Sequence, residues 1–221
     1  MSVRPAVVLD LDGTLLDTSA RYYAVYQLIA ESLQIHPLAF SGYWRKRRCG
    51  LSNIEVLMQQ GLPVKDRTQA EEIWLRLIES PEMLKKDRLF PGVGRWLKTW
   101  NGKVAFVLAT MRSDELAAKA QLTELGLSGC FRRILVLRHK TDPVAVKANA
   151  VSGIKCEKIF AWIGDSEVDM RAARRIGAQA LGVTSGIRNV EVLLSAGATE
   201  VFKLVTNIQI KPDYGGGSLR I

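Results

Sequence analysis

The sequence predicts an α/β protein with a doubly wound, Rossmann-like parallel sheet as its core and a small inserted helical cap domain. Short, almost wholly apolar segments alternate with amphipathic segments of helical period, which is typical of a parallel sheet covered by helices on both faces. Residues 18–88 break this alternation and show helical periodicity alone. The first observation predicts the core, and the second predicts the insertion.

Six short apolar runs are predicted to be strands buried on both faces. They are Ala6–Leu9, Val104–Ala109, Ile134–Leu137, Ile159–Ile163, Ala178–Val183 and Val201–Leu204. Helices are expected between them. Ser113 is expected to cap a helix that stops at Gly126, and Asp142 followed by Pro143 indicates the N-cap and first position of another.

The inserted stretch carries two apolar stripes of helical spacing. One runs from Tyr22 to Leu33, and the second runs from Ile73 to Ile78 and is ended by Pro81. We therefore predict a discontinuous core domain formed by residues 1–17 and 89–221, and a helical cap domain formed by residues 18–88.

Composition narrows the classes of partner. The formal net charge is +9, which suits an anionic partner, but the dense basic run Arg45–Arg48 comes without the signature of a nucleic-acid module. No apolar run is long enough to span a bilayer, and no secretory signal opens the chain. We expect a cytoplasmic protein with reduced cysteines and neither membrane nor nucleic acid as partner. Monomer and dimer both stay open.

The strongest chemical signal is DLDGTLLD at residues 10–17, directly after the first predicted strand. In an open parallel sheet, ligands bind beyond the carboxyl ends of the strands, so Asp10 and Asp12 would project into that crevice. Two neighbouring carboxylates repel each other, which favours a bound cation. Mg²⁺ takes oxygen ligands from one or two carboxylates and a substrate phosphate, and Gly13 would permit a tight turn after the pair.

This octet resembles the first motif of the haloacid dehalogenase superfamily, in the branch that contains phosphatases. The resemblance implies that Asp10 is a nucleophile forming an aspartyl-phosphate. It implies that Asp12 protonates the leaving oxygen and then activates water. The dehalogenase branch lacks an acid at the second position, so a dehalogenase activity is disfavoured.

The later motifs of the superfamily are expected in order at strand ends. Thr110 ends the second predicted strand and matches the residue that hydrogen-bonds the phosphoryl oxygens. The string from Gly164 to Asp169 resembles GDxxxD, which implies that Asp165 ligates Mg²⁺ and that Asp169 supports the site. Asp10, Asp165 and the backbone carbonyl of Asp12 are then the expected protein ligands of the metal.

The motif lysine has two candidates. Lys140 is followed by Pro143 at the third position, as in phosphoglycolate-phosphatase relatives, although Thr141 replaces their first proline. Lys147 resembles the lysine of relatives in which it begins the following helix. Lys140 is preferred, and both are kept as catalytic candidates.

The position of the cap resembles that of phosphoglycolate phosphatase and beta-phosphoglucomutase, in which a cap loop selects the leaving group. The candidate loop here is Arg45–Asn53, with Arg47 and Arg48, together with Gly13 in the core, as substrate-binding residues. The alternative for the basic residues is that they solvate a helix.

The predicted function is Mg²⁺-dependent hydrolysis of a small phosphorylated metabolite of the phosphoglycolate, sugar phosphate or nucleotide class. Two alternatives share the fold. A phosphomutase would use the same core with other cap contacts, and a regulatory or binding module would use the fold without catalysis.

Overall fold

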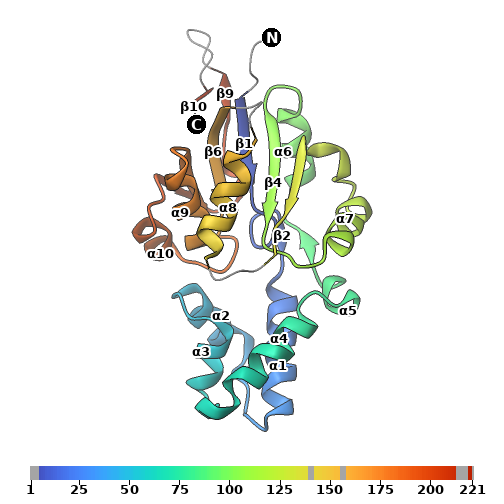
Figure 1. The fold of residues 1–221 in the computed structure, drawn as a ribbon, viewed down its shortest axis with the longest axis vertical. Helices are drawn as coiled ribbons and strands as arrows, with labels where there is room; N and C mark the ends of the chain where they lie inside the picture. Colours follow the sequence, from blue (N-terminus) through green and yellow to red (C-terminus); the bar gives the residue numbers. More distant parts are fainter. Residues whose placement is uncertain (1–4, 139–141, 155–157, 213–218, 221) are drawn as a thin grey trace.

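The computed structural model of the 221-residue chain describes residues 5–138, 142–154, 158–212 and 219–220 (Figure 1). Its core is a six-stranded parallel sheet with the strand order β5-β4-β1-β6-β7-β8. The strands are β1 (Pro5–Leu9), β4 (Ala105–Thr110), β5 (Arg133–Val136), β6 (Lys158–Gly164), β7 (Gln179–Val183) and β8 (Glu200–Phe202). All six predicted strands are present with small shifts at their ends, so the predicted doubly wound parallel sheet is confirmed.

The first strand lies at the centre of the sheet. Leu9 pairs with Leu108 of β4 on one side and with Ile163 of β6 on the other. The chain goes on to β4 and β5 on one side of β1, and then to β6, β7 and β8 on the other. The order of strands therefore reverses at β1, and in such sheets the ligand crevice lies outside the carboxyl ends of the strands at this switch point.

Alternation along the strands builds two apolar layers. In β1, Val7 and Leu9 face one layer, and Ala6 and Val8 face the other. The first layer includes residues of α6 (Val93–Trp100) and α7 (Glu115–Glu124), and the second includes residues of α8 (Pro143–Ser152), α9 (Glu167–Arg175) and α10 (Val190–Ser195). Helices thus cover both faces of the sheet.

Two predicted helix starts can be compared with the structure. Asp142 caps α8 by accepting a hydrogen bond from the Ala145 amide, and Pro143 is its first residue, so both assignments are confirmed. The prediction of Ser113 as the cap of α7 was wrong. The neighbouring Asp114 is the N-cap, because its carboxylate accepts the Ala117 amide at 2.9 Å.

The inserted residues form a separate helical group with its own apolar centre, below the sheet in Figure 1. Its helices are α1 (Ser19–Ser32), α2 (Phe40–Arg48), α3 (Asn53–Met58), α4 (Arg67–Leu77) and α5 (Pro81–Leu84). The stripe predicted for the first helix is confirmed by Val25, Tyr26 and Ile29, which are fully buried in this centre. Pro81 lies after the end of α4, as predicted, and it is also the first residue of α5.

Two short strands, which the sequence did not predict, flank the helical insertion. The chain enters it through β2 (Leu16–Asp17) and leaves through β3 (Arg88–Leu89), and these two short strands pair antiparallel. The proposed boundaries between core and cap fall in this ladder. Short 3₁₀ turns (η1 Val64–Asp66, η2 Ser128–Cys130, η3 Val205–Asn207) and an antiparallel pair, β9 (Lys211–Pro212) with β10 (Leu219–Arg220), complete the described elements.

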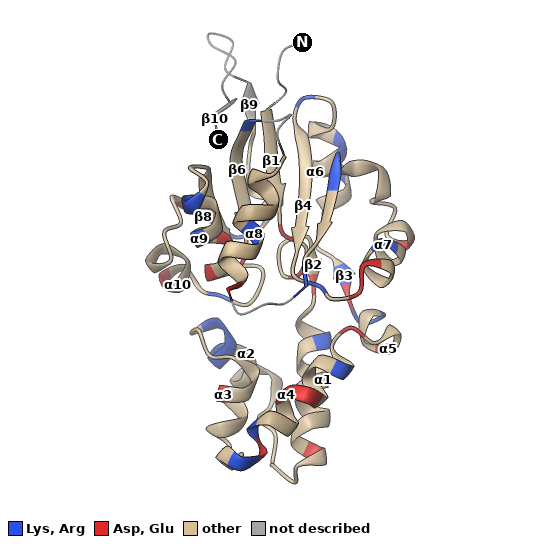
Figure 2. Cartoon of the chain, in the orientation of Figure 1, with Lys and Arg blue, Asp and Glu red and all other residues tan. Residues whose placement is uncertain are grey.

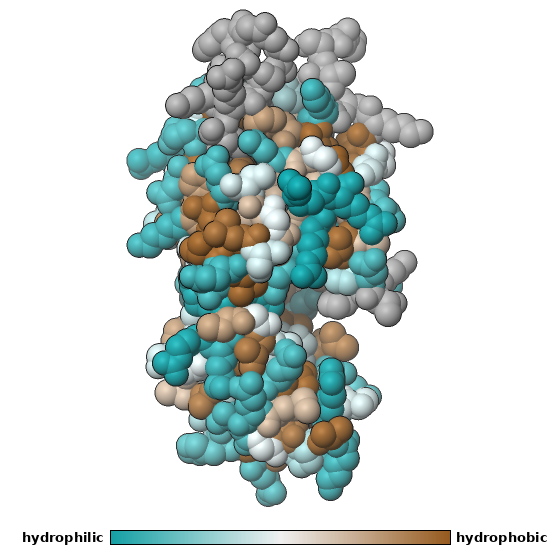
Figure 3. All heavy atoms as spheres, turned by 90° about the vertical axis from the view of Figure 1, so that its left-hand side faces the viewer, coloured by the Kyte–Doolittle hydropathy of each residue, from teal (hydrophilic) through white to brown (hydrophobic). Residues whose placement is uncertain are grey.

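Charged residues are distributed over both parts of the molecule, as Figure 2 shows. On the face seen in Figure 3, hydrophilic side chains cover most of the surface of core and cap, with smaller apolar areas between them. Cys49 and Cys130 are free thiols, and Cys156 lies outside the described residues. None of the helices in the described part of the chain combines the length and the apolar character needed to cross a membrane.

Candidate active site

Three buried aspartates meet where β1 and β6 end. Asp10 directly follows β1, Asp165 directly follows β6, and Asp169 lies in the first turn of α9. One carboxylate oxygen from each lies within 4.8 Å of the other two, and the three residues are 6%, 3% and 0% exposed. These three residues are called the acidic cluster below. The sequence motifs placed all three at strand ends, and the structure brings them together.

Lys147 supplies the positive charge inside this cluster. Its Nζ donates to Asp10 Oδ1 at 2.6 Å and to Asp169 Oδ1 at 2.7 Å, and the lysine is 2% exposed. Burial opposes the charged form of the ammonium, but the carboxylates of Asp10 and Asp169 outweigh it and raise the pKa of Lys147. Of the two lysine candidates, Lys147 therefore contacts the expected nucleophile, and Lys140 lies outside the described residues.

Asp169 is held from several sides. Besides Lys147, it contacts the indole Nε1 of Trp162 at 3.3 Å, and its Oδ2 accepts the Ser166 hydroxyl at 2.5 Å. These bonds occupy much of its capacity to accept hydrogen bonds. Asp169 is therefore suited to orient Lys147, which leaves Asp10 and Asp165 as the carboxylates best placed to hold a cation.

The charge balance of the cluster fits a divalent cation. Burial raises the pKa of Asp10 to about 7 even beside Lys147, and burial with the charges of Asp10 and Asp169 raises the pKa of Asp165 well above its usual range. Three carboxylates against one ammonium leave two uncompensated negative charges when all are ionised. Because the candidate ligands are all oxygen atoms, the site suits a hard cation such as Mg²⁺.

Two glycines leave room for Asp165. Gly13 has a left-handed φ of +82°, and a Cβ built there would lie 2.2 Å from Asp165 Oδ2. A Cβ on Gly186, in the loop after β7, would lie 1.8 Å from the same oxygen, which also accepts the Ile187 amide at 2.7 Å. The Gly13 amide itself donates to the Leu16 carbonyl at 2.8 Å. In this geometry Gly13 contributes space and a turn, and its role in binding substrate stays a prediction.

Asp12 stands apart from the acidic cluster. Its carboxylate receives Nε of Arg112 at 2.9 Å, Nη2 of the same guanidinium, and Nη2 of Arg21 at 2.7 Å. Burial alone would raise the pKa of Asp12, but the charges of Arg112 and Arg21 outweigh burial and hold that pKa well below its usual range. Asp12 lies only two residues after Asp10, but its surroundings lower its pKa, whereas those of Asp10 raise the pKa of that residue.

A fourth charged residue completes this arrangement. Asp87, just before β3, is 4% exposed and lies 2.9 Å from Arg21 Nε and 3.2 Å from Arg112 Nη2. Asp12, Arg21, Asp87 and Arg112 are called the Asp12 network below. Sequence reasoning missed its other three members. The available signals were weak: Arg112 follows Thr110 by two positions at a strand end, and Arg21 lies shortly after the first motif.

Thr110 occupies the expected place. It is the last residue of β4 and is 1% exposed, at the edge of the sheet where β1 also ends. Its predicted contact with phosphoryl oxygens remains a prediction.

The candidate cap loop differs from the prediction. Arg45–Arg48 are the last turn of α2, and only residues 49–52 form a loop before α3. Basic residues in a last helical turn are stabilised by the partial negative charge of the helix end, which explains why the run is helical. The alternative, that these residues solvate a helix, suits the exposed Arg45 but not the buried Arg47.

The two arginines predicted to bind substrate have different surroundings. Arg48 Nη1 donates to the Thr184 carbonyl at 2.8 Å, and the Arg48 carbonyl accepts the Asn189 amide at 3.0 Å. Arg188 Nη1 donates to the Arg47 carbonyl at 2.7 Å. The end of α2 is therefore docked on the loop after β7, and Arg48 serves this contact between cap and core.

Arg47 points elsewhere. Its side chain is 5% exposed, donates from Nη1 to the Leu51 carbonyl at 2.7 Å, and leaves Nε without a hydrogen-bond partner among the described residues. Its guanidinium lies 5.7 Å from the centroid of the Tyr22 ring, and burial lowers the pKa of Arg47. A buried guanidinium with an unused donor is suited to an anionic group.

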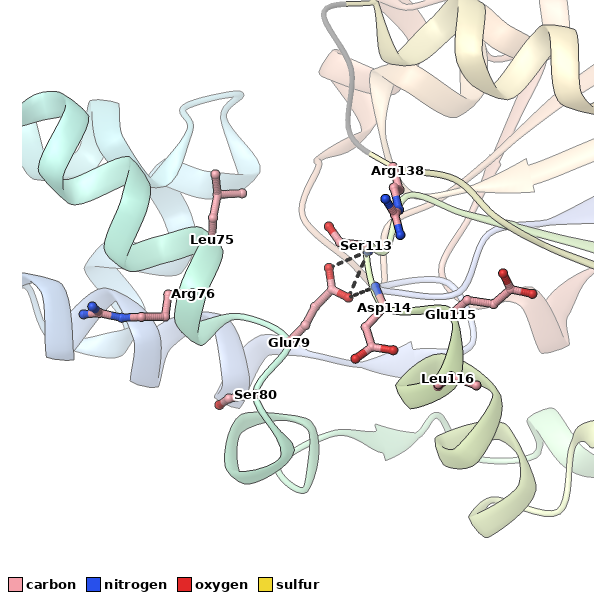
Figure 4. A pocket seen from close by; sticks show the side chains of 9 residues that line it. All are labelled: Leu75, Arg76, Glu79, Ser80, Ser113, Asp114, Glu115, Leu116 and Arg138. Atoms are coloured by element: carbon pink, nitrogen blue, oxygen red, sulfur yellow. Dashed lines mark hydrogen bonds between the residues drawn. The ribbon is translucent and has the colours of Figure 1, made fainter.

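A second contact between cap and core lies on another side. The Glu79 carboxylate accepts the Ser113 amide at 2.8 Å and the Asp114 amide at 3.0 Å, beside a cavity of about 620 Å³ (Figure 4). The residues that line it are Leu75, Arg76, Glu79, Ser80, Ser113, Asp114, Glu115, Leu116 and Arg138. No member of the acidic cluster lines this cavity. The cavity is therefore separate from the candidate active site at the acidic cluster.

Comparison with known proteins agrees with this geometry. The family described as haloacid dehalogenase-like hydrolase matches residues 5–177. The chain belongs to this family. Phosphoglycolate phosphatase from Neisseria gonorrhoeae is 27% identical over 90% of this chain and 88% of its own length. A phosphorylated carbohydrates phosphatase from Thermotoga maritima is 28% identical over 90% and 94%.

Solved structures show the same fold. A haloacid dehalogenase-like hydrolase from Streptococcus pneumoniae superposes with a TM-score of 0.73 at 21% identity, covering 91% of this chain and 94% of its own. The family and its relatives together make this haloacid dehalogenase-like protein an enzyme of the phosphatase type. The predictions of the family and of an enzyme are thereby confirmed.

Proposed function

We propose that this enzyme hydrolyses small phosphomonoesters, with Asp10 as the nucleophile, Asp12 as proton donor and acceptor, and Mg²⁺ as cofactor. The observation that carries the proposal is the pairing of Asp10 with Lys147 at 2.6 Å beside the carboxylate of Asp165. A buried carboxylate at the switch point of the sheet, facing a lysine and a cation-binding carboxylate, suits nucleophilic attack on a phosphoryl group.

The chemistry takes two steps. In the first, an Asp10 oxygen attacks phosphorus, the bond to the leaving oxygen breaks, and that oxygen takes a proton from Asp12. In the second, water attacks the phosphorus of the aspartyl-phosphate and gives a proton to Asp12, which frees inorganic phosphate and restores Asp10. The proton that Asp12 loses in the first step is therefore regained in the second. Because Arg112 and Arg21 favour the ionised form of Asp12, we propose that Asp12 takes up its proton only while substrate occupies the site, where the negative charge of the phosphoryl group offsets the two arginines.

Charge stabilisation supplies most of the catalysis in such reactions. Lys147 Nζ, 2.6 Å from Asp10 Oδ1, would neutralise charge on the nucleophile and the transferred group. Mg²⁺ held by Asp10, Asp165 and the Asp12 carbonyl would add positive charge at the phosphoryl oxygens. We assign Thr110, at the end of β4, to hydrogen bonding of those oxygens, and Asp169 to orienting Lys147 through the 2.7 Å bond between them.

The substrate class follows from the cap and from the relatives. Arg47 keeps a buried donor without a partner among the described residues, which favours a leaving group that carries an anion. The relatives named above act, by their names, on phosphoglycolate and on phosphorylated carbohydrates. We therefore propose small phosphorylated metabolites as substrates, and we propose a cytoplasmic location for their turnover.

The test is phosphate release from a panel of phosphorylated metabolites, with and without Mg²⁺, followed by acid quench during turnover. We expect Mg²⁺-dependent release and a phosphoryl group on the peptide that contains Asp10, located by mass spectrometry. Absence of phosphate release from every substrate, or a phosphoryl group on another residue, would contradict the proposal. Conversion of a sugar phosphate to its isomer without free phosphate would instead identify a phosphomutase.

A further inference from the structure

We propose that Arg112 and Arg21 are positioning residues that orient the Asp12 carboxylate for proton transfer, Arg112 from the core and Arg21 from the cap. The inference rests on the proposed function, in which Asp12 gives a proton to the leaving oxygen and receives one from water. It goes beyond that function, because neither arginine belongs to the motifs that suggested it.

The hydrogen bonds determine which oxygen of Asp12 keeps a free acceptor position. Arg112 spans the carboxylate with Nε on Oδ2 at 2.9 Å and Nη2 on Oδ1, and Arg21 Nη2 adds a second bond to Oδ1 at 2.7 Å. A carboxylate offers about two acceptor sites on each oxygen. Oδ1 accepts two hydrogen bonds and Oδ2 accepts one, so the free acceptor position of the carboxylate is on Oδ2.

The planar guanidinium of Arg112 also sets the plane of the carboxylate. Two parallel bonds from one rigid fork restrict rotation in a way that a single donor cannot. The side chain of Asp12 is 18% exposed, whereas those of Arg21 and Arg112 are 2% and 3% exposed. Of these three side chains, Asp12 is therefore the one that presents itself to a reactant.

The arginines are themselves held in place. Arg112 Nη1 donates to Gln121 Oε1 at 2.6 Å, and Gln121 Nε2 donates to Asp87 Oδ2 at 3.0 Å. Arg21 Nη1 donates to the Ile78 carbonyl at 3.0 Å. The Asp12 network holds two positive and two negative charges, so its guanidinium groups are paired within the protein. This pairing favours an orienting role over direct binding of a substrate phosphate.

The network also connects Asp12 to both passages of the chain between core and cap. Arg21 lies in α1 soon after β2, Ile78 follows α4, and Asp87 directly precedes β3. Because Arg21 is part of the cap, its bond to Asp12 holds only for cap positions close to the present one. The orientation of the proton donor is thus coupled to the position of the cap.

The test compares two aryl phosphates of almost equal size, 4-nitrophenyl phosphate and phenyl phosphate, of which the second has the less acidic leaving group. General acid catalysis contributes about 10²–10⁴-fold, and it matters most when the leaving oxygen is basic. Asp12→Asn provides the reference. We expect it to lower kcat/KM for phenyl phosphate at least about tenfold more than for 4-nitrophenyl phosphate.

Arg112→Lys keeps the charge and removes the fork, so the buried aspartates stay compensated. We expect Arg112→Lys, like Asp12→Asn, to lower kcat/KM more for phenyl phosphate than for 4-nitrophenyl phosphate. In the Asp12→Asn background, Arg112→Lys should lower kcat/KM by less than about a further twofold. Arg21→Lys removes one of three bonds to Asp12 and provides an independent variant, with a smaller effect of the same direction. Circular dichroism and thermal unfolding check that each variant is folded.

Arg188→Lys is the matched control. Arg188 is also a buried, ion-paired arginine at the contact between cap and core. It is bonded to Glu167 of α9 at 2.6 Å and donates to the Arg47 carbonyl of α2. We expect it to affect both esters equally. Equal losses for both esters in Arg112→Lys and in Arg21→Lys, with discrimination retained in Asp12→Asn, would overturn the inference and leave the proposed function standing. Equal losses in Asp12→Asn would overturn the role of Asp12 itself.

Discussion

Asp10 and Asp12 are two residues apart in the chain, and the structure places them in opposite electrostatic surroundings. Asp10 belongs to the acidic cluster, in which three carboxylates share one lysine. Asp12 belongs to a network in which two carboxylates face two arginines. The first group has an excess of negative charge and calls for a cation, and the second is already balanced.

This difference in charge balance suggests different roles for Asp10 and Asp12. A negative excess attracts a divalent cation and, through it, a phosphate. A balanced network repels neither cation nor anion strongly, and it fixes geometry through hydrogen bonds instead. We therefore expect changes in the acidic cluster to abolish phosphoryl transfer or metal binding. Changes around Asp12 should alter how the reaction depends on the leaving group.

The largest effect is expected from Asp10→Asn. The amide keeps the shape of the side chain but is a poor nucleophile, so turnover should fall by at least about a thousandfold, as for other members of a catalytic unit. Steady-state phosphate release from 4-nitrophenyl phosphate measures this, with circular dichroism to show that the fold is kept. Turnover close to that of the unmodified enzyme would rule out Asp10 as the nucleophile.

Metal removal sharpens the comparison on the side of the acidic cluster. We expect chelation to abolish activity and added Mg²⁺ to restore it. Asp165→Ala should weaken Mg²⁺ binding more than Asp169→Ala, because Asp169 is engaged by Lys147, Trp162 and Ser166. Residues that support ligands commonly change affinity about 10–100-fold. Calorimetric titration of Mg²⁺ gives both affinities, and the reverse order would contradict the assignment of ligands.

The two lysine candidates can be separated directly. Lys147→Met removes an ammonium 2.6 Å from Asp10, so kcat/KM should fall about a hundredfold, the upper range for one charge-assisted hydrogen bond. Lys140→Met is the matched control, with an expected change of less than about threefold. A large loss in Lys140→Met with little loss in Lys147→Met would return the role to Lys140.

The smallest effects are expected in the cap. Arg47→Ala should raise KM about ten- to a hundredfold for an anionic metabolite found in the panel, and much less for phenyl phosphate. Arg48→Ala removes the bond to the Thr184 carbonyl and should lower kcat/KM a few-fold for both substrates. Equal responses of Arg47→Ala to both substrates would assign Arg47 to folding or docking rather than to the leaving group.

The sequence by itself determined the sheet, its insertion and the members of the acidic cluster. Short, continuous apolar runs are typical of strands buried on both faces of a parallel sheet, so the positions of these runs predicted the strands of the core. Asp10, Asp165 and Asp169 directly follow or lie close to strand ends, and parallel strands end at one edge, so these residues had to meet there. Local pattern was sufficient because each residue is positioned by its own strand or by the helix that follows it.

Tertiary structure alone decided the partners of Asp12, the contact of Lys147 with Asp10 and the separate surroundings of Arg47 and Arg48. Arg112 lies one hundred positions from Asp12 in the chain, and Lys147 lies 137 positions from Asp10. A lysine or arginine on a helix looks the same in sequence whether it faces water or a buried carboxylate. Only the packing of helices onto the sheet, and of the cap onto the core, determines which charges are brought out of water and must therefore pair.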